Sequence, residues 1–340
     1  MTSRKLYNVA VIGATGAVGG VFLQVAAERS FPIKSLKLLA TERSAGKRVA
    51  FGEGEITVEA TTPEAINGAD FVFISATDEV SREYGLRARE TGAIAIDDSA
   101  VWRQDPTVPL VVTEVNPDDV EDHRGILAIP NCSTTPVVMC LWPLHVRNPV
   151  TRVICDTYQS VSGTGTGAVR ELEEQTRAWA SGGSAPATVY PQQIAFNALP
   201  HIGSFKEGGY TSEELKMSAE ARKIMHAPDL ALSATCVRVP VFIGHSIAVH
   251  AEFERPWDPD EVRAILREAP GVVLQDDPAS NAYPTPLDAA GKDPVYVGRV
   301  RQDMSHPNGV AMWISSDNLR KGAALDALQI AEEMVARGIV

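Results

Sequence analysis

Short apolar runs and longer amphipathic segments alternate along the first 130 residues of the chain. β-branched and other apolar side chains fill the short runs, as is typical of strands buried on both faces. The longer segments carry apolar residues at helical spacing, one through Phe22, Leu23, Val25 and Ala26 and the other over residues 80–90. Strands that alternate with helices form a parallel sheet with right-handed crossovers, so this part predicts a doubly wound α/β domain. Its strand-like runs are residues 7–12, 35–39, 71–75 and 93–97.

The pattern changes after residue 132. The strand-like runs become longer and alternate between apolar and polar positions, which is typical of a sheet with one solvated face. Helices predicted at residues 171–180 and 212–225 are expected to cover the other face. Residues 319–336 predict a strongly amphipathic helix that returns to pack on the first domain. The strand-like runs of this part are residues 152–161, 234–241, 246–254, 295–300 and 309–315.

A chain of 340 residues is too long for one small core, so two domains are expected. The first comprises residues 1–131 and is completed by the C-terminal helix, residues 319–340. It is predicted to be a doubly wound parallel α/β domain. The second comprises residues 132–318 and is predicted to be an α+β domain with a mixed, mostly antiparallel sheet.

Composition excludes several function classes. A net charge of −12 argues against nucleic-acid binding, because phosphate backbones need a basic surface. No apolar run approaches the ~20 residues that span a bilayer, and the N-terminus lacks the apolar stretch of a signal peptide. We therefore expect a cytoplasmic protein without membrane contact. The four cysteines, Cys132, Cys140, Cys155 and Cys236, show no Cys-x-x-Cys spacing, which indicates neither a metal site nor redox pairing.

Gly13, Gly16 and Gly19 follow the first predicted strand and open the first predicted helix. A glycine-rich turn in this context brings backbone amides against a pyrophosphate, and the positive end of the helix dipole favours the negative charge. The spacing therefore predicts a dinucleotide-binding turn. A tight strand-to-helix turn without a ligand is the alternative.

The end of the second predicted strand carries residues that distinguish NAD from NADP. An acidic residue here would hold a ribose 2′-hydroxyl, whereas an arginine would hold a 2′-phosphate. Arg43, with Thr41 and Ser44, can build a phosphate pocket and favours NADP, while Glu42 argues for NAD. Alternatively, Arg43 and Lys47 belong to a solvated loop.

Cys132 stands between an apolar strand-like run, residues 125–129, and an apolar helical run, residues 137–144. Unpaired amides and the helix dipole at such a junction stabilise a thiolate, the nucleophilic form of cysteine. The alternative is a small buried residue that happens to begin a helix. A nucleophile needs a base, and His245 is the best candidate, because it lies next to Gly244 where one predicted strand ends and the next begins.

Five segments together resemble the aspartate-semialdehyde dehydrogenase family: residues 13–19, 43–47, 131–134, 238–245 and 317–324. The resemblance runs in order over nearly the whole chain. It implies a Rossmann domain and a catalytic domain that also dimerises, as a homodimer or a dimer of dimers. It implies NADPH-dependent reductive dephosphorylation of 4-aspartyl phosphate to aspartate 4-semialdehyde, with release of phosphate.

The resemblance also implies residue roles. Cys132 would be the nucleophile, His245 the general acid/base, and Gln159 would orient the reacting groups. Arg238 would bind the α-carboxylate and Glu213 the ammonium of the substrate, while Arg103, Lys216 and Asn131 would face its phosphate. The cofactor would contact Gly13, Thr15, Gly16, Ala17, Val18, Gly19, Thr41, Arg43, Ser44, Ser162, Gly163 and Asn318. From the sequence alone, a surface ion pair between Glu213 and Lys216 is the preferred interpretation.

Two local departures from the family pattern are Glu42 and residues 164–167. A related alternative is another acyl-phosphate reductase, such as N-acetyl-glutamyl-phosphate reductase, but that family is expected to carry glycine before its cysteine and an aromatic residue after it. A non-catalytic NADP sensor is a further alternative, although it would not need a cysteine, a histidine and an arginine in these contexts. A short-chain reductase would need a Tyr-x-x-x-Lys pair, which is absent.

Overall fold

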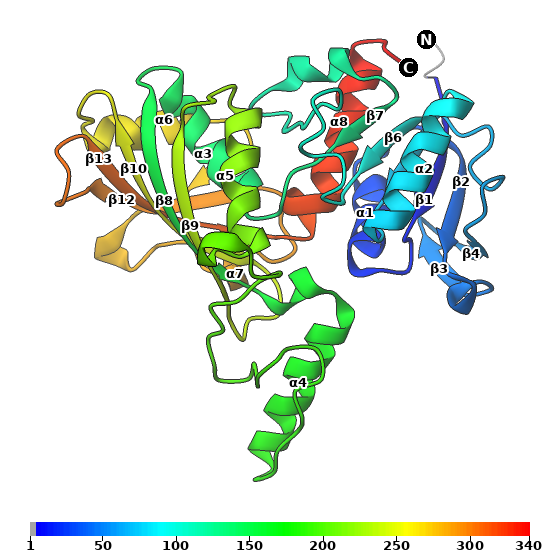
Figure 1. Cartoon of the computed structure of the whole chain (residues 1–340), viewed down its shortest axis with the longest axis horizontal. Helices are drawn as coiled ribbons and strands as arrows, with labels where there is room; N and C mark the ends of the chain where they lie inside the picture. Colours follow the sequence, from blue (N-terminus) through cyan, green and yellow to red (C-terminus); the bar gives the residue numbers. More distant parts are fainter. Residues whose placement is uncertain (1–4) are drawn as a thin grey trace. The chain divides into compact units, whose positions relative to one another are not determined.

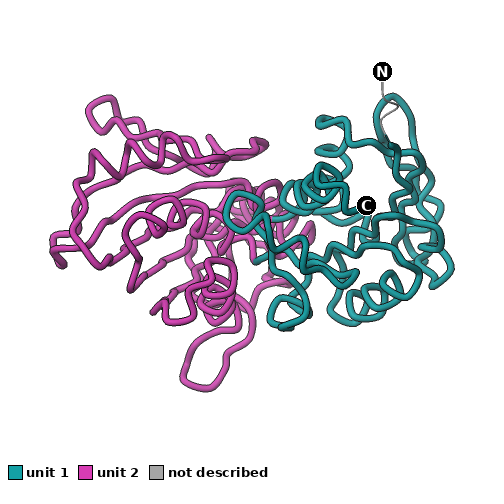
Figure 2. The backbone as a smooth tube through the Cα atoms, turned by 90° about the horizontal axis from the view of Figure 1, so that it is seen from above, with its two compact units in different colours: residues 1–130, 323–340 teal, residues 131–322 magenta. Residues whose placement is uncertain are grey.

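The computed structural model describes residues 5–340. The prediction about a signal peptide concerns the N-terminal segment, of which residues 1–4 lie outside the described part. The backbone divides into two compact units, residues 1–130 with 323–340 and residues 131–322 (Figure 2). The sequence pattern predicts these two boundaries after residues 131 and 318. Among the described residues, no helix is both long and apolar enough to cross a membrane.

The first unit is built on a seven-stranded sheet in the order β3-β4-β2-β1-β5-β6-β7 (Figure 1). All neighbours run parallel except β3 and β4, which form an antiparallel pair at one edge. The strands are β1 (Tyr7–Ile12), β2 (Ile33–Ala40), β3 (Arg48–Phe51), β4 (Gly54–Ala60), β5 (Phe71–Ile74), β6 (Ile94–Asp97) and β7 (Ile126–Ala128).

Helices cover this sheet on both faces. The connection from β1 to β2 through α1 (Ala17–Glu28) and the connection from β5 to β6 through α2 (Asp78–Thr91) run in opposite directions across the sheet. Because both crossovers are right-handed, α1 and α2 lie on opposite faces of the sheet. The C-terminal helix α8 (Leu325–Ala336) packs beside α1, and together they bury the main core of this unit. Two rings mark its centre, Phe22 of α1 and Phe73 of β5, whose centroids are 4.1 Å apart.

The second unit contains a six-stranded mixed sheet in the order β11-β12-β13-β10-β8-β9. Three of its neighbouring pairs are antiparallel, whereas β8 with β9 and β11 with β12 are parallel. The strands are β8 (Val150–Gln159), β9 (Ala231–Arg238), β10 (His245–Phe253), β11 (Val272–Leu274), β12 (Val295–Gln302) and β13 (Gly309–Ser316). The two-sheet α/β and α+β fold class predicted from the sequence is thus confirmed.

One face of this second sheet is covered and the other is open. Helices α3 (Thr134–His145), α5 (Ser212–Ile224) and α6 (Pro259–Glu268) pack against the covered face, while α4 (Thr166–Ala180) and the short α7 (Pro286–Ala289) lie in its connections (Figure 1). The open face carries aromatic side chains, among them Tyr158 and Trp313, whose ring centroids are 5.3 Å apart. Tyr158 remains 40% exposed.

Some elements differ from the sequence prediction. The helix predicted from residue 319 begins with a π-helical turn at Arg320–Ala324 before α8 starts. The edge hairpin β3–β4 was not predicted, because most of its side chains are exposed and its apolar pattern is weak. Helix α6 was also not predicted, although Asp258 caps its first turn and Pro259 occupies the first helical position, as expected at a helix start.

Candidate active site

Cys132 and His245 face each other in the second unit. Cys132 lies two residues before α3, and its Sγ is 3.3 Å from Nε2 of His245, the first residue of β10. The imidazole is completely buried, whereas Cys132 is partly accessible. The backbone N–H of Ser160 donates to the other ring nitrogen, Nδ1, over 3.1 Å. The thiol and the imidazole predicted from distant parts of the sequence therefore form a hydrogen-bonded pair.

The amide of Ser160 fixes the tautomer of His245. Because an N–H group can only donate, Nδ1 must act as an acceptor, and the proton of the neutral ring lies on Nε2, next to the sulfur. Burial lowers the pKa of His245 well below its usual value, and the charge of Arg238 lowers it further. At neutral pH the ring is consequently neutral, and its Nε2–H can donate a hydrogen bond that stabilises a thiolate on Cys132.

The residue before the nucleophile is held from three sides. The Asn131 side-chain oxygen accepts the Ser133 amide over 2.9 Å, and its NH₂ group donates to Glu213 over 2.9 Å. Its backbone N–H donates to the carboxylate of Glu220 over 2.7 Å. Glu220 is fully buried and was not identified from the sequence. A signal was available, because Glu213 and Glu220 are seven residues apart and so share one face of α5.

Glu213 forms the ion pair with Lys216 that their spacing allows, but its carboxylate is buried and does not lie at the surface. Its Oε1 accepts from the amide groups of Asn131 and Gln159, at 2.9 Å and 3.1 Å. Its Oε2 lies 3.5 Å from the ammonium of Lys216, which is about one-third exposed. Thr157 in turn donates to the side-chain oxygen of Gln159 over 3.0 Å, which fixes the orientation of that amide.

Arg238 ends β9 as a buried cation. Its side chain is 4% exposed, and its Nη1 donates to the backbone oxygen of Ser160 over 2.6 Å. No carboxylate within residues 5–340 forms an ion pair with it. A buried guanidinium without a counter-ion is costly, and an anionic ligand would compensate its charge. The planar fork of this side chain is suited to bidentate binding of a carboxylate.

Asn318 organises the loops around this pair. Its side-chain oxygen accepts from the hydroxyls of Ser160 and Ser162, at 3.0 Å and 3.2 Å, and from the backbone N–H of Gly244 at 3.0 Å. Its NH₂ group lies 3.0 Å from the Ser162 hydroxyl. The residue therefore holds the segments on either side of His245. Ser160 was not predicted, although its backbone groups and its hydroxyl both contact the site.

Two glycines leave room for the reacting groups. A Cβ on Gly322 would lie 2.8 Å from Cβ of Cys132, so a larger residue there would displace the nucleophile. A Cβ on Gly163 would lie 3.1 Å from Nη1 of Arg238 and 3.3 Å from Nε2 of His245. All three separations are shorter than ordinary van der Waals contacts.

We expect Gly163→Ala to lower turnover about tenfold while the protein stays folded, because the added methyl group presses on Arg238 and His245. Steady-state kinetics and thermal unfolding would measure the two effects. Gly167→Ala is the matched control, since its Cβ would meet only Val189 at an ordinary 3.7 Å. Equal activities of the two variants would contradict the assigned geometry.

The glycine-rich turn lies in the first unit, at the carboxyl end of β1. Gly13 has a positive φ of 85°, and a Cβ there would lie 2.0 Å from the backbone oxygen of Ser75. A Cβ on Gly19 would lie 2.3 Å from the oxygen of Gly13, so the tight turn itself requires glycine at both positions. Helix α1 starts at Ala17 with no side-chain cap and no acidic residue in its first turn. Its first amides, which include those of Ala17 and Val18, are therefore suited to a phosphate group.

The other predicted cofactor residues of this unit follow β2. Thr41 precedes a short 3₁₀ turn, Glu42–Ser44, and the Ser44 hydroxyl is 3.4 Å from both the Thr15 hydroxyl and the Lys47 ammonium. Ser44 is buried, whereas Glu42 and Arg43 are exposed. Within the described chain, neither Glu42 nor Arg43 forms an ion pair. The guanidinium of Arg43 thus remains available to a ligand.

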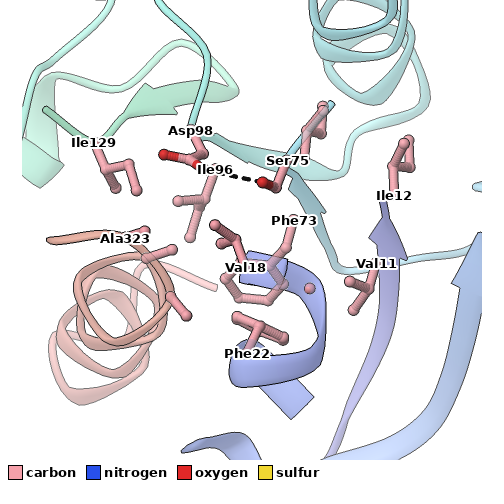
Figure 3. Close-up of a pocket in the computed structure, with 14 residues that line it drawn as sticks. Val11, Ile12, Val18, Phe22, Phe73, Ser75, Ile96, Asp98, Ile129 and Ala323 are labelled. Carbon is pink, nitrogen blue, oxygen red and sulfur yellow. Dashed lines mark hydrogen bonds between the residues drawn. The ribbon is translucent and has the colours of Figure 1, made fainter. Parts of the chain in front are cut away.

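A small cavity of about 20 Å³ lies beneath the glycine-rich turn, far too small for a dinucleotide. Figure 3 shows its apolar lining and one polar contact, the Ser75 hydroxyl donating to the Asp98 carboxylate over 2.9 Å. Arg103 is buried beside it and donates to the Asp98 backbone oxygen over 2.7 Å. Burial raises the pKa of Asp98 to about 6, although the charge of Arg103 opposes that shift.

Comparison with known proteins decides the family. Residues 8–123 match the NAD binding domain of semialdehyde dehydrogenases, and residues 141–321 match their dimerisation domain. Aspartate-semialdehyde dehydrogenase of Aquifex aeolicus (strain VF5) is 49% identical over 98% of this chain and 99% of that protein. The chain belongs to the aspartate-semialdehyde dehydrogenase family. The resemblance drawn from five sequence segments is thereby confirmed.

Solved structures of aspartate-semialdehyde dehydrogenases share the same fold. The crystal structure of aspartate semialdehyde dehydrogenase II from Vibrio cholerae, complexed with ASA, is 42% identical with a TM-score of 0.94, over 98% of this chain and 99% of that one. The enzyme from Candida albicans, solved with NADP, is 26% identical with a TM-score of 0.76, over 99% of this chain and 100% of that one.

Within this member of the aspartate-semialdehyde dehydrogenase family, the predicted residues fall into two groups. The second unit joins Asn131, Cys132, Gln159, Ser162, Gly163, Glu213, Lys216, Arg238, His245 and Asn318 through the contacts described above. The first unit carries the residues predicted around the glycine-rich turn, together with Arg103. Ser160, Glu220 and Gly322 are additional residues that surround the cysteine and the imidazole.

The raised pKa of Asp98 predicts a pH-dependent stability. Its carboxyl binds a proton more tightly in the folded state, with a pKa of about 6 against an ordinary 3.8, so stability falls as pH rises through this interval. We expect Asp98→Asn to raise the unfolding free energy by up to about 3 kcal/mol at pH 8 and to change it little at pH 4. Thermal unfolding at both pH values measures this. A variant less stable than the wild type at pH 8 would contradict the shift.

Proposed function

We propose that this protein catalyses the NADPH-dependent reductive dephosphorylation of 4-aspartyl phosphate to aspartate 4-semialdehyde. The observation that carries this proposal is the 3.3 Å contact between Cys132 and a neutral, buried His245, beside the uncompensated guanidinium of Arg238. A nucleophile and a carboxylate-binding cation in one site suit an acyl substrate that carries its own carboxylate. Such a reaction serves amino-acid biosynthesis, and neither N-acetyl-glutamyl-phosphate reduction nor a non-catalytic sensor is favoured for a member of this family.

Cys132 carries the covalent steps. Its thiolate attacks the acyl carbon of aspartyl phosphate, the carbon–oxygen bond to phosphate breaks, and a thioester remains. Reduction of this thioester needs a hydride, which a bound nicotinamide would supply. The thiohemiacetal that results on Cys132 then collapses, which releases the aldehyde and restores the thiolate. His245 holds a proton at Nε2 beside the sulfur and serves as general acid/base in these exchanges.

The substrate is bound through its charges. Arg238 receives the α-carboxylate, and Glu213, whose position is fixed by Asn131 and Gln159, receives the ammonium. We assign the phosphate to Lys216, Asn131 and Arg103, and inorganic phosphate is the leaving group. Gln159 orients the acyl group, since Thr157 holds its amide in one orientation.

The cofactor is proposed to be NADP rather than NAD. The amides at the start of α1, with Gly13, Thr15, Gly16, Ala17, Val18 and Gly19, would hold the pyrophosphate. Thr41, Arg43 and Ser44 would hold the 2′-phosphate, and Lys47 adds a second cation near Ser44. Gly163, Ser162 and Asn318 would line the nicotinamide end. When bound, the cofactor supplies the reducing hydride and the residues named here supply its position.

Replacing Arg43 tests this preference. We expect Arg43→Ser to raise KM for NADP about tenfold and to leave KM for NAD nearly unchanged, because only NADP carries the phosphate that a guanidinium would bind. Initial rates with both cofactors measure the ratio. Glu42→Gln is the control, and it should not weaken NADP binding. A parallel loss with both cofactors in Arg43→Ser would refute the 2′-phosphate assignment.

Association with further copies of this chain is also proposed. The second unit matches a dimerisation domain, and the open face of its sheet exposes aromatic side chains such as Tyr158. We propose a homodimer, or a dimer of dimers, that covers this face. A cytoplasmic location is part of the same proposal, in keeping with four cysteines that are all free thiols.

The direct test is an assay in the reverse direction. Protein, NADP, phosphate and aspartate semialdehyde should produce the absorbance of reduced nicotinamide, and omission of phosphate should abolish it. N-acetyl-glutamate semialdehyde in place of aspartate semialdehyde should give little signal. Binding of NADP without turnover would refute the proposed activity.

A further inference from the structure

A second cavity lies in the second unit, away from the proposed active site. It has a volume of about 440 Å³ and is formed where the chain leaves α3, where it leaves β10 and where α6 begins. None of the residues assigned above to the reaction lines it. Its lining residues are Arg147, Asn148, Arg255, Pro256, Trp257 and Glu261.

The two segments that carry its arginines are joined by a buried amide. The Asn148 side chain is 3% exposed and bonds both backbone groups of Arg255, donating to its oxygen over 2.8 Å and accepting from its N–H over 3.1 Å. The Glu254 amide adds a bond to the oxygen of Pro149 over 3.0 Å. The cavity wall is therefore pre-formed and does not depend on a flexible loop.

The charges around this cavity lack partners within the described residues. Arg147 and Arg255 are exposed, and within residues 5–340 no carboxylate forms an ion pair with either. The guanidinium of Arg255 donates to the neutral backbone oxygen of Arg147 over 2.8 Å. Glu261, in the first turn of α6, likewise has no cationic partner. By contrast, Arg337 contacts three carboxylates. Two guanidiniums at one hollow, in a chain of net charge −12, point to an external anion.

Trp257 gives the cavity a rigid apolar wall. Its ring is 8% exposed and meets Phe253 edge-on, with centroids 6.0 Å apart and an interplanar angle of 89°. Its indole nitrogen has no hydrogen-bond partner among the described residues. Pro256 continues the same wall. A ligand of this cavity should therefore combine charged groups with a short carbon skeleton.

We propose that this cavity binds a free amino acid. Its carboxylate would pair with Arg147 and Arg255, its ammonium would pair with Glu261, and its carbon skeleton would pack on Trp257. A simple dianion fits less well, because Glu261 would repel it. This ligand takes no part in the reaction, so the site offers a place for control by a metabolite that differs from the substrate.

Isothermal titration of the full-length protein tests the proposal, with L-glutamate, L-leucine and L-phenylalanine as probes. At least one of them should bind saturably at millimolar concentration or below. Its N-acetyl derivative, which lacks the ammonium, and the amine without a carboxylate should each bind at least tenfold more weakly. Inorganic phosphate should not compete. Equal binding of phosphate or of the N-acetyl derivative would reduce the cavity to an unspecific anion patch and overturn the proposal.

Variants locate the bound molecule. Arg147→Gln with Arg255→Gln should weaken binding at least tenfold and leave the assay rate unchanged, and Glu261→Gln should weaken it as well. Arg255→Lys, which keeps the charge, should retain part of the affinity. These side chains are exposed, so the unfolding temperature without ligand should stay constant. Binding that persists in both the double variant and Glu261→Gln, or no binding by any probe, would refute the site without affecting the proposed reaction.

Discussion

Cys132→Ser should lose at least ~10³-fold in turnover while its unfolding temperature and its affinity for NADP stay close to those of the wild type. A serine hydroxyl is far less ionised than a thiol at neutral pH, and the neutral His245 accepts little of its proton. Oxygen is also a poorer leaving group when the thiohemiacetal collapses. Formation of reduced nicotinamide from aspartate semialdehyde, phosphate and NADP measures the loss.

Cys140→Ala is the matched control for this variant. Cys140 is completely buried in α3, and burial raises the pKa of its thiol, so it cannot supply a thiolate. Its replacement should cost stability and leave the rate per folded molecule unchanged. Alkylation should likewise be fast at Cys132 and slow at Cys140. If Cys132→Ser kept more than a tenth of the wild-type turnover, the assignment of the nucleophile would be wrong.

Arg238→Met should lower kcat/KM by about 10³-fold without destabilising the fold. The wild-type guanidinium is buried with no carboxylate partner in residues 5–340, so the folded state bears its desolvation cost until an anion binds. Methionine fills a similar volume without charge, so the unfolding temperature should stay equal or rise. The loss of the contact with the Ser160 oxygen offsets part of that gain.

Arg320→Met provides the contrast. Arg320 is also buried, but its guanidinium lies 2.6 Å from the carboxylate of Asp293. Its removal leaves Asp293 without that partner and should lower the unfolding temperature. Thermal unfolding with and without a substrate analogue separates the two cases. A clear destabilisation by Arg238→Met would mean that Arg238 stabilises the fold and would contradict the prediction.

The parts of the fold that the sequence predicted are those with strong periodicity. The run at Tyr7–Ile12 is apolar on both faces and corresponds to β1 without a shift. The edge hairpin β3–β4 carries mostly exposed side chains, and its pairing depends on a neighbouring strand that local pattern does not reveal. Similarly, α8 begins after a π-helical turn, and the amphipathic pattern of residues 319–336 does not distinguish that turn from the α-helix.

The site was predicted to the extent that chemistry depends on residue type. Cys132 and His245 are 113 residues apart, yet a thiol and an imidazole each suggest a role before their contact is known. The backbone N–H of Ser160 sets the tautomer of His245, and Gly322 acts through the side chain that it lacks. Neither effect has a signature in a single sequence, so only the three-dimensional structure identifies these two residues.

Asn318 has a consequence for the order in which the protein becomes active during synthesis. Its side chain joins Ser160, Ser162 and the turn at Gly244, but it follows Cys132 by 186 residues in the sequence. A nascent chain therefore carries its nucleophile long before the amide that orients the surrounding loops has been made. Copies that stop before residue 318 should possess the sulfur of Cys132 without the amide that orients the loops around it.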